Sequence, residues 1–221
     1  MVLDPAARGS TSRVDLQLIA SMIEPGSRVL DVGCGDGELL RLLNATRDVD
    51  CRGVEISQQG VNACVTQGLS VVQGDADTDL VNYPTKGFDY VILSQTLQAT
   101  FEPRKVLREM ARIGRRAIVS FPNFGHWSVR VHVLARGQMP ITATLPYLWY
   151  ETPNIHLCSI DDFIQMADEM GLTIERFIAL DRNGMISWTN RYPQLANLLA
   201  AQALFLLRGG CVQVSEPAHR S

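Results

Sequence analysis

Strand-like and helix-like segments alternate along most of this chain, and this alternation restricts its fold more than any other feature. Short apolar runs are separated by segments whose apolar residues recur at helical spacing. The expected strands are 28–33, 51–57, 69–75, 88–94, 115–123 and 172–180, with a last one within 197–209. The expected helices are 13–23, one from 38, one that Ser57 caps and Gly68 ends, one between Pro103 and Gly114, and 160–170, which Ser159 and Asp162 begin with the pattern of a capping box. We predict a doubly wound, mainly parallel, seven-stranded Rossmann-like α/β sheet whose last strand is antiparallel.

Length and composition are those of one ordinary globular domain. The chain has 221 residues, of which 46% are hydrophobic and 19% charged, as in a protein with a sizeable core. We expect a flexible N-terminal tail at 1–12, a single domain over 13–208 with a long irregular insertion at about 123–158, and a C-terminal tail at 209–221.

Charge, cysteine usage and hydropathy indicate a cytoplasmic, soluble protein. The net charge of −3 predicts no general attraction to nucleic acid. The five cysteines form no C-x-x-C pair, which favours a reducing compartment, and we predict no metal site. The N-terminal residues lack the pattern of a signal peptide, and no apolar run is long enough to cross a membrane.

The stretch "VLDVGCGDG" at 29–37 places three glycines in five positions directly after an apolar strand. A helix is expected from Glu38 onward. Because glycine has no Cβ, such a turn allows a ligand to approach the backbone closely. In doubly wound sheets, ligands bind at the carboxyl ends of the strands, where this turn lies. We therefore interpret 31–37 as a ligand loop.

Three nucleotide-binding patterns compete for this loop, and one of them fits. A Walker loop requires a Lys that the sequence does not supply, and the dinucleotide pattern G-x-G-x-x-G has Glu38 at its last glycine. The D-x-G-x-G-x-G pattern of S-adenosylmethionine (SAM) sites matches Asp31, Gly33, Gly35 and Gly37, with Cys34 inside the loop. SAM carries an amino-acid end and a sulfonium cation in place of a pyrophosphate, so a carboxylate at the strand end suits it.

Two further carboxylates support an adenosyl ligand. Glu55, followed by Ile56, ends the second strand, where it can accept both ribose hydroxyls. Asp75 ends the third strand, where it can accept from the adenine amino group while the Ala76 backbone contacts the ring edge. The alternative is that Glu55 and Asp75 cap helices beside a tight turn.

The residues after the fourth strand leave the methyl acceptor undefined. Ser94, Gln95 and Thr96 stand where many amino-methylating enzymes carry Asn/Asp-Pro-Pro-aromatic, so that signature is excluded. These polar residues either hold the methionine end of SAM or an acceptor, or cap the following turn. The sequence assigns no catalytic residue.

The insertion carries polar and aromatic residues for which two functions compete. They either shape an acceptor pocket or meet a partner protein: Asn123, His126, Tyr147, Trp149, Tyr150 and His156. For His156 we favour a hydrogen-bonded role that fixes the loop before helix 160–170. For 145–152 we favour a partner surface, because aromatic residues are enriched at interfaces.

Four stretches of the chain together resemble the MetW family of bacterial methionine biosynthesis proteins. They are "LDVGCGDGELL", "VILSQTLQAT", "VLREMARIGRRAIVSFPNFGHW" and "LPYLWYETPNIHLCSIDDF", and the resemblance extends from about 13 to 208. It implies the class I SAM-dependent methyltransferase fold, SAM or S-adenosylhomocysteine as ligand, and homoserine O-acyltransferase as partner.

Two functions from different classes follow from this reasoning. In the first, the chain binds SAM and activates or regulates homoserine O-acyltransferase in methionine biosynthesis. In the second, it is a free-standing SAM-dependent methyltransferase that acts on a small-molecule acceptor. The absence of an acceptor signature, beside an aromatic insertion suited to docking, favours the first.

Overall fold

The structure, a computed structural model, describes residues 14–142, 145, 147–181, 186–187 and 192–209. The predicted tail at 1–12 and nearly all of the one at 209–221 lie outside these residues, although Gly209 itself ends the last strand. The strands are β1 (Arg28–Val32), β2 (Asp50–Glu55), β3 (Val71–Gln73), β4 (Phe88–Ser94), β5 (Gly114–Pro122), β6 (Leu172–Leu180), β7 (Ile186–Ser187) and β8 (Gln202–Gly209). The α-helices are α1 (Val14–Met22), α2 (Glu38–Arg47), α3 (Gln58–Val65), α4 (Pro103–Ile113), α5 (Trp127–Arg136), α6 (Ile160–Glu169) and α7 (Pro193–Leu199). Two short 3₁₀ helices, η1 (Leu80–Asn82) and η2 (Leu97–Ala99), flank β4.

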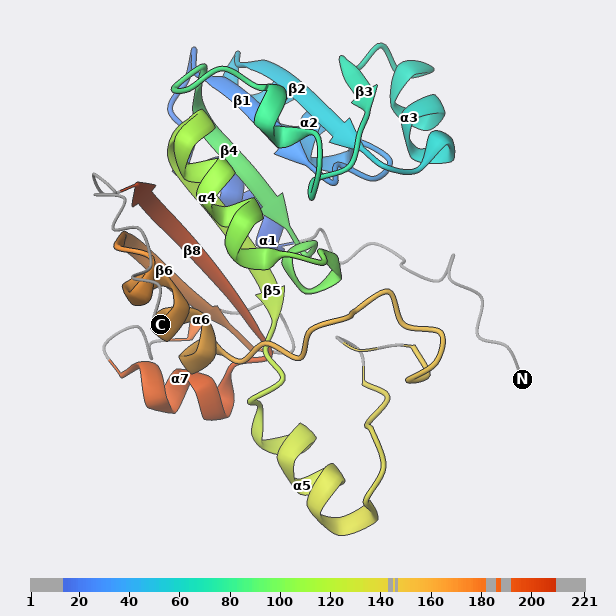
Figure 1. Cartoon of the computed structure of the whole chain (residues 1–221), viewed down its shortest axis with the longest axis vertical. Helices are drawn as coiled ribbons and strands as arrows, with labels where there is room; N and C mark the ends of the chain where they lie inside the picture. The colour runs from blue at the N-terminus through green and yellow to red at the C-terminus, as the bar shows by residue number, and fades with distance from the viewer. Residues whose placement is uncertain (1–13, 143–144, 146, 182–185, 188–191, 210–221) are drawn as a thin grey trace, which may run out of the picture.

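All the strands of the described part join one sheet in the order β3-β2-β1-β4-β5-β8-β6-β7 (Figure 1). The first five in that order run parallel, whereas β8 is antiparallel to both of its neighbours, β5 and β6. The predicted doubly wound sheet with an antiparallel last strand is thus confirmed, and the two-residue β7 adds to the seven strands predicted. The strand order reverses between β1 and β4, so the glycine loop that follows β1 lies at the switch point of the sheet.

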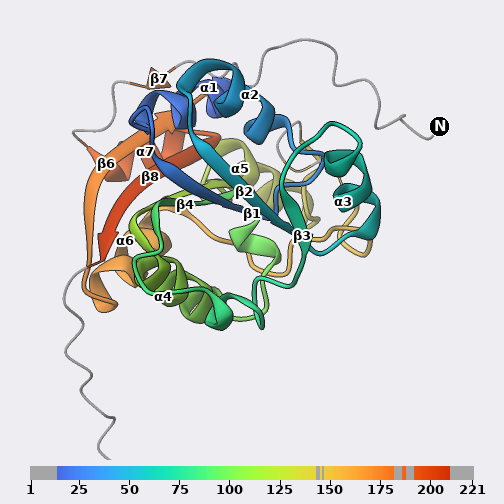
Figure 2. The same ribbon diagram turned by 90° about the horizontal axis from the view of Figure 1, so that it is seen from above.

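Alternation along the central strands builds a core on each face of the sheet. Leu30 and Val32 of β1 pack in one buried cluster with α4 and α6, and Val29 packs in the other with α1 and α2. Figure 2 shows these two pairs of helices on opposite sides of the sheet. Because both faces are covered, the central strand β4 is mostly apolar and buried along most of its length.

Helix boundaries follow the residues that the sequence marks. Ser159 and Asp162 form a reciprocal capping box at the start of α6, and the Ser57 side chain accepts from the Gly60 N–H at the start of α3. Pro103 occupies the first turn of α4, where its missing N–H costs no hydrogen bond. These predicted caps are confirmed.

The expectation of an irregular insertion at about 123–158 is wrong over 127–136, where the structure has helix α5. The His126 ring accepts from the Ser128 N–H and caps it. Apolar periodicity marks helices by the face that they bury, but α5 buries Val129 alone among its residues, all of which the structure describes. A helix without a buried face gives little periodic signal.

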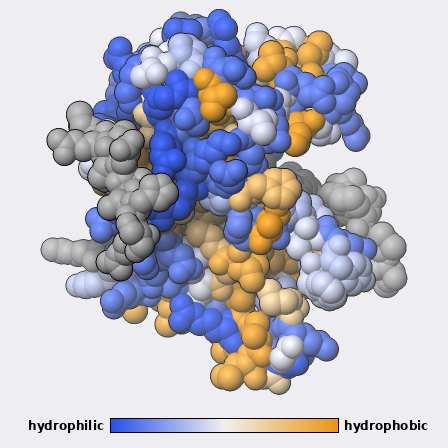
Figure 3. All heavy atoms as spheres, in the orientation of Figure 1, coloured by the Kyte–Doolittle hydropathy of each residue, from blue (hydrophilic) through white to orange (hydrophobic). Residues whose placement is uncertain are grey.

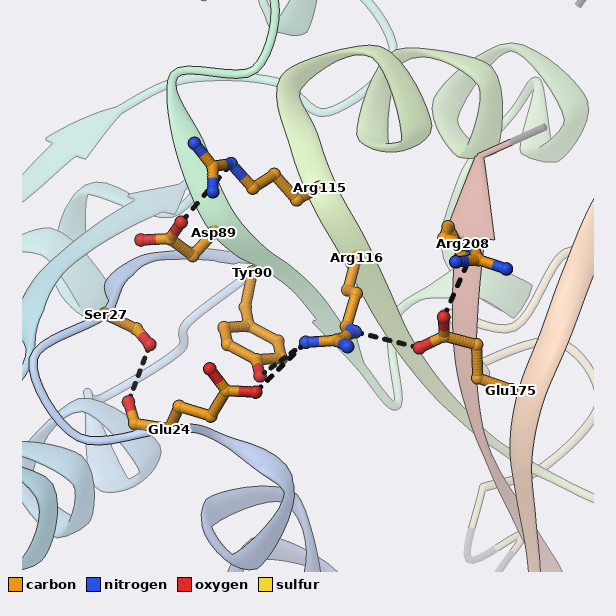
Figure 4. A network of polar contacts seen from close by, with 8 residues as sticks. All are labelled: Glu24, Ser27, Asp89, Tyr90, Arg115, Arg116, Glu175 and Arg208. Atoms are coloured by element: carbon orange, nitrogen blue, oxygen red, sulfur yellow. Dashed lines mark hydrogen bonds and ion pairs between the residues drawn. The ribbon is translucent and has the colours of Figure 1, made fainter. Parts of the chain in front are cut away.

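A polar network fastens the sheet at the edge opposite to the glycine loop (Figure 4). Arg116 of β5 donates to Glu24 (3.2 Å), to the Tyr90 hydroxyl (3.3 Å) and to Glu175 (2.8 Å), and Glu175 also pairs with Arg208 at 3.3 Å. The network therefore links the end of α1 to β4, β5, β6 and β8. Since its members pair with one another, these charged side chains stabilise this edge of the sheet.

Candidate functional site

The loop between β1 and α2 is a tight turn fixed to β2. Gly33, Gly35 and Gly37 have φ values of +73°, +57° and +81°, in the left-handed region that favours glycine. The N–H groups of Gly33 and Cys34 both donate to the carbonyl of Val54, at 2.7 and 3.2 Å. The loop is therefore ordered by its own backbone contacts, as a preformed ligand cradle must be.

The three glycines meet different surroundings. A Cβ on Gly33 would lie 2.8 Å from the Thr96 side chain, and one on Gly37 would collide with Leu69. A Cβ on Gly35 would have no heavy atom of the described chain within 4 Å, its own neighbours aside. Packing thus explains the lack of a side chain at Gly33 and Gly37, whereas Gly35 borders open space where a ligand can approach.

Glu55 joins this loop to the start of α3. Its Oε2 accepts from the Gly35 N–H and its Oε1 from the Ser57 N–H, both at 2.8 Å, and the residue is 8% exposed. These are the contacts expected if Glu55 caps the start of α3 beside a tight turn. Because a carboxylate oxygen has two lone pairs, each oxygen keeps acceptor capacity for a ligand hydroxyl. Beside it, the apolar side chain of Ile56 is 65% exposed.

The loop after β3 is held by its own aspartates. Asp75 accepts from the Asp77 N–H, and the Asp75 N–H donates to Asp79, both at 2.8 Å. Asp77 in turn accepts from the N–H groups of Phe101 and Glu102, at 2.9 and 2.8 Å, where α4 begins. Sequence reasoning missed the role of Asp77, because the spacing of aspartates in this loop does not show that one of them accepts from backbone groups more than twenty residues away.

The loop after β4 closes against the glycine loop. The Ser94 hydroxyl lies 3.2 Å from that of Ser120, and the Gln95 N–H donates to the Ser120 carbonyl at 2.9 Å. Gln95 has a φ of +56°, a strained value for a residue with a side chain. Thr96 occupies the space beside Gly33. Ser94 and Gln95 therefore stand next to the candidate ligand loop while also forming a turn, so both of their predicted roles stay open.

The other predicted residues of the site are wholly or partly buried. Asp31 is 2% exposed at the end of β1, and Ala76 packs partly buried against the core. The Cys34 side chain lies against β2, since a Cβ on Gly53 would be 2.7 Å from its sulfur. Burial, and secondly the charge of Asp31, raise the pKa of the Cys34 thiol. Cys34 is therefore a packing residue with a protonated thiol, and only its backbone is available to a ligand.

Gln98, which sequence reasoning also missed, connects the insertion to this site. Its carbonyl accepts from the N–H groups of Ile155 and His156, at 2.8 and 3.0 Å, and its side-chain amide donates to the Gln95 carbonyl at 2.7 Å. The His156 ring lies 3.4 Å from the Phe101 carbonyl. His156 thus has the structural role that we favoured for it.

Asn123 lies in the interior of the protein. It is 3% exposed, and its amide donates to the carbonyls of Asn197 and Ala200, at 2.8 and 2.7 Å. Its oxygen accepts from the N–H groups of Gly125 and Ile160. With these contacts the side chain holds β5, α6 and α7 together.

The remaining aromatic candidates lie on the surface. Tyr147, Trp149 and Tyr150 are 45%, 74% and 64% exposed, and the last two rings contact each other edge to face. His126, by contrast, is buried as the cap of α5.

Two properties of the described residues bear on ligands and location. None of the helices they form combines the length and the apolar character needed to cross a bilayer. Among the same residues, no three His, Cys, Asp or Glu side chains gather as they would around a metal ion.

The family description "Methionine biosynthesis protein MetW" matches residues 13–207 of the chain. The chain belongs to the MetW family. A relative in Rhodopirellula baltica, named as a bifunctional methionine biosynthesis protein MetXA/MetW, is 34% identical over 180 residues. That match covers 77% of this chain, but the chain spans only 29% of the length of that relative.

Solved structures have the fold of this MetW family chain at low sequence identity. A SAM-dependent methyltransferase from Mesorhizobium loti is 16% identical, with a TM-score of 0.65 over 89% of this chain and 98% of that one. Another, from Archaeoglobus fulgidus, is 17% identical, with a TM-score of 0.64 over 91% and 95%. At these identities the likeness shows the fold, which is of the class I SAM-dependent methyltransferase type.

Proposed function

We propose that the chain binds SAM or S-adenosylhomocysteine at the carboxyl edge of β1, β2 and β4 and regulates a homoserine O-acyltransferase partner. The observation that carries the binding site is the open space at Gly35, directly beside the buried carboxylate of Glu55. A glycine-rich loop next to a carboxylate with two acceptor oxygens suits a ligand that combines a cationic centre with vicinal hydroxyls.

Each candidate residue has a place in this proposal. The backbone of the glycine loop from Gly33 to Gly37, together with Asp31, faces the methionine end and the sulfonium. Glu55 accepts from the ribose hydroxyls, and the exposed Ile56 side chain covers the adenine. The residues that complete the site contact the adenine or the methionine end: Asp75, Ala76, Ser94 and Gln95.

The partner is proposed from the family and from the relative that joins two activities in one polypeptide. The MetXA/MetW protein of Rhodopirellula baltica carries the region similar to this chain within one longer polypeptide. Parts that are joined in one organism often act together as separate chains in another. The acyltransferase is therefore the partner that we propose for this chain.

Regulation requires that SAM distinguish the bound from the free chain. The Gln98 side chain donates to Gln95 at the edge of the site, and the Gln98 carbonyl holds the insertion at Ile155. A ligand that reorders the loop after β4 thereby acts on the insertion. A coupling of about 1–3 kcal/mol would change partner affinity by about five- to 150-fold, and the partner would change SAM affinity by the same factor.

The second function, methyl transfer to a small molecule, is favoured by the fold that the chain shares with methyltransferases. Methyl transfer needs mainly alignment of the acceptor with the sulfonium carbon, so the lack of an acid–base pair does not exclude it. It predicts slow conversion of SAM to S-adenosylhomocysteine by the chain in cell extract, whereas a regulatory subunit leaves SAM intact.

One experiment tests the whole proposal. SAM and S-adenosylhomocysteine are titrated calorimetrically into the chain alone, into the purified acyltransferase, and into the two together, while acyltransferase activity is followed across the same SAM range. We expect binding to the chain and a different SAM dissociation constant in the mixture. Equal constants with activity independent of SAM would refute regulation, and the absence of any binding would refute the site.

A further inference from the structure

Helix α5 exposes most of its large apolar side chains. The exposed fractions of Trp127, Val131, Val133 and Leu134 are 47%, 52%, 41% and 89%, and Val129 alone of this helix is buried. Figure 1 shows α5 beyond the end of β5, apart from the helices that cover the sheet. A helix of ten residues that is rich in β-branched Val has little stability of its own in water. Among the residues of α5, only Val129 is buried against the rest of the described chain.

The chain that follows α5 adds to the same exposed apolar surface. Eight of its large apolar side chains are between 38% and 74% exposed, whereas Leu145 is buried: Met139, Ile141, Tyr147, Leu148, Trp149, Tyr150, Ile155 and Leu157. Figure 3 shows apolar residues gathered at the lower end of the molecule, where α5 lies. At about 150–250 Å² for a fully exposed large side chain, these residues and those of α5 present roughly 1,000 Å² of side-chain surface. This summed area is comparable with one side of a stable protein interface, about 800 Å².

The charges of this stretch favour a protein over a lipid surface. Over 127–157 the sequence contains Arg130 and Arg136 and a single acid, Glu151, in a chain whose net charge is −3. The Arg130 side chain donates to the Gly125 carbonyl at 2.6 Å, which holds it against the fold. A helix that lies on a membrane needs a face rich in Lys and Arg, and α5 has none. An apolar centre with a sparse basic rim fits a protein surface that is apolar at its centre and acidic at its edge.

We propose that α5 and the described residues 139–142, 145 and 147–157, together called the α5 surface, form the docking site for the homoserine O-acyltransferase subunit. This inference rests on the proposed function. In a polypeptide that joins both parts, the tether keeps them at high local concentration, so a modest interface suffices. Two separate chains have no tether, and the surface itself must supply the affinity. An exposed apolar area of interface size meets that need.

The test uses the full chain and the purified acyltransferase of the same organism. Leu134→Asp places a charge at the most exposed apolar residue of α5, and Trp149→Ala removes the most exposed aromatic ring of the α5 surface. Leu195→Asp is the matched control, because Leu195 is a 42% exposed leucine on α7. Calorimetry measures acyltransferase affinity and SAM affinity for each variant, and sedimentation measures self-association.

We expect Leu134→Asp and Trp149→Ala each to weaken acyltransferase binding at least tenfold, since a few central residues dominate an interface. SAM affinity should not change in either variant, and Leu195→Asp should bind like the wild type. If the wild type binds the acyltransferase and both α5-surface variants bind it equally well, the docking site is wrong while the partnership stands. If the wild type does not bind the acyltransferase at all, the proposed function fails, and the docking site fails with it.

Two further outcomes would replace the acyltransferase as the occupant. In one, the wild-type chain self-associates, and Leu134→Asp abolishes self-association without any effect on acyltransferase binding. That result would show the α5 surface to be a contact between copies of the chain. Flotation with vesicles of phosphatidylglycerol and phosphatidylethanolamine that Leu134→Asp abolishes, again with acyltransferase binding unchanged, would show it to be a membrane contact. Either result overturns the proposal.

Discussion

Replacing Gly35 by Ala separates the ligand role of this residue from its role in folding. The φ of Gly35 is +57°, and a Cβ there meets no heavy atom of the described chain within 4 Å. The added methyl group therefore causes no clash in the free protein. The folded state is destabilised only by the strain of a left-handed residue that carries a side chain, about 1–2 kcal/mol. For a chain of this size, that lowers Tm by about 2–4 °C per kcal/mol.

The effect on SAM should be larger and specific. The methyl group would stand in the space that we propose for the ligand, and forcing an extra carbon into an occupied site costs about 1–3 kcal/mol. The expected result is a tenfold to hundredfold larger dissociation constant for SAM, measured by calorimetry at matched protein concentration. Thermal unfolding of the same samples measures the strain separately.

Gly26→Ala is the matched control for this experiment. Gly26 has a φ of +75°, and a Cβ there also meets no heavy atom of the described chain within 4 Å, but it precedes β1 at the opposite edge of the sheet. Both variants should lose similar stability, and only Gly35→Ala should lose SAM affinity. If both bind SAM like the wild type, the glycine loop does not contact the ligand. If both lose affinity equally, the loss reflects backbone strain and the reasoning fails.

Three further predictions follow from other contacts. Glu55→Gln keeps the size of the side chain but removes its charge, so it should weaken SAM binding about tenfold by calorimetry, whereas Asp50→Asn at the other end of β2 should have no effect. Asn123→Ala leaves buried backbone groups unpaired and should lower the free energy of unfolding by about 2–3 kcal/mol in urea; an unchanged midpoint would contradict its role in joining β5, α6 and α7. Burial raises the pKa of the Cys51 and Cys158 thiols to about 12 from 9.0. Since the unfolded chain releases these protons first, stability should fall as the pH rises above about 9, and Cys51→Ala should flatten that fall.

The sequence predicted the features that local chemistry determines. Alternating apolar segments gave the sheet and its antiparallel last strand, and Ser159 with Asp162 gave the start of α6, because a capping box needs only residues three apart. The glycine loop was likewise predicted from local sequence, as a turn between an apolar strand and a helix. The two-residue β7 was not predicted, since two residues carry no periodic pattern.

What the sequence did not reveal depends on contacts between distant segments. Asp77 accepts from the start of α4, Gln98 holds the insertion, and Asn123 joins three elements of the carboxyl half. In each case a polar side chain or carbonyl serves backbone groups far away in sequence, and no spacing rule identifies them. Helix α5 was missed for a different reason: its apolar residues face outward, and the expected signal of a helix is a buried face.

These missed contacts also determine how the candidate site can communicate with the α5 surface. Asp77 ties the loop after β3 to the start of α4, and Gln98 ties the loop after β4 to the insertion that follows α5. The adenine side and the methionine side of the proposed SAM site therefore both meet in the segment 94–102. A ligand that orders this segment also restricts the insertion that is hydrogen-bonded to it. When a partner then binds the insertion, the chain loses less conformational entropy than it would without the ligand. This coupling is reciprocal, so the hydrogen bonds at Gln98 make SAM binding and partner binding favour each other. A partner that binds only after these hydrogen bonds break would instead oppose SAM binding.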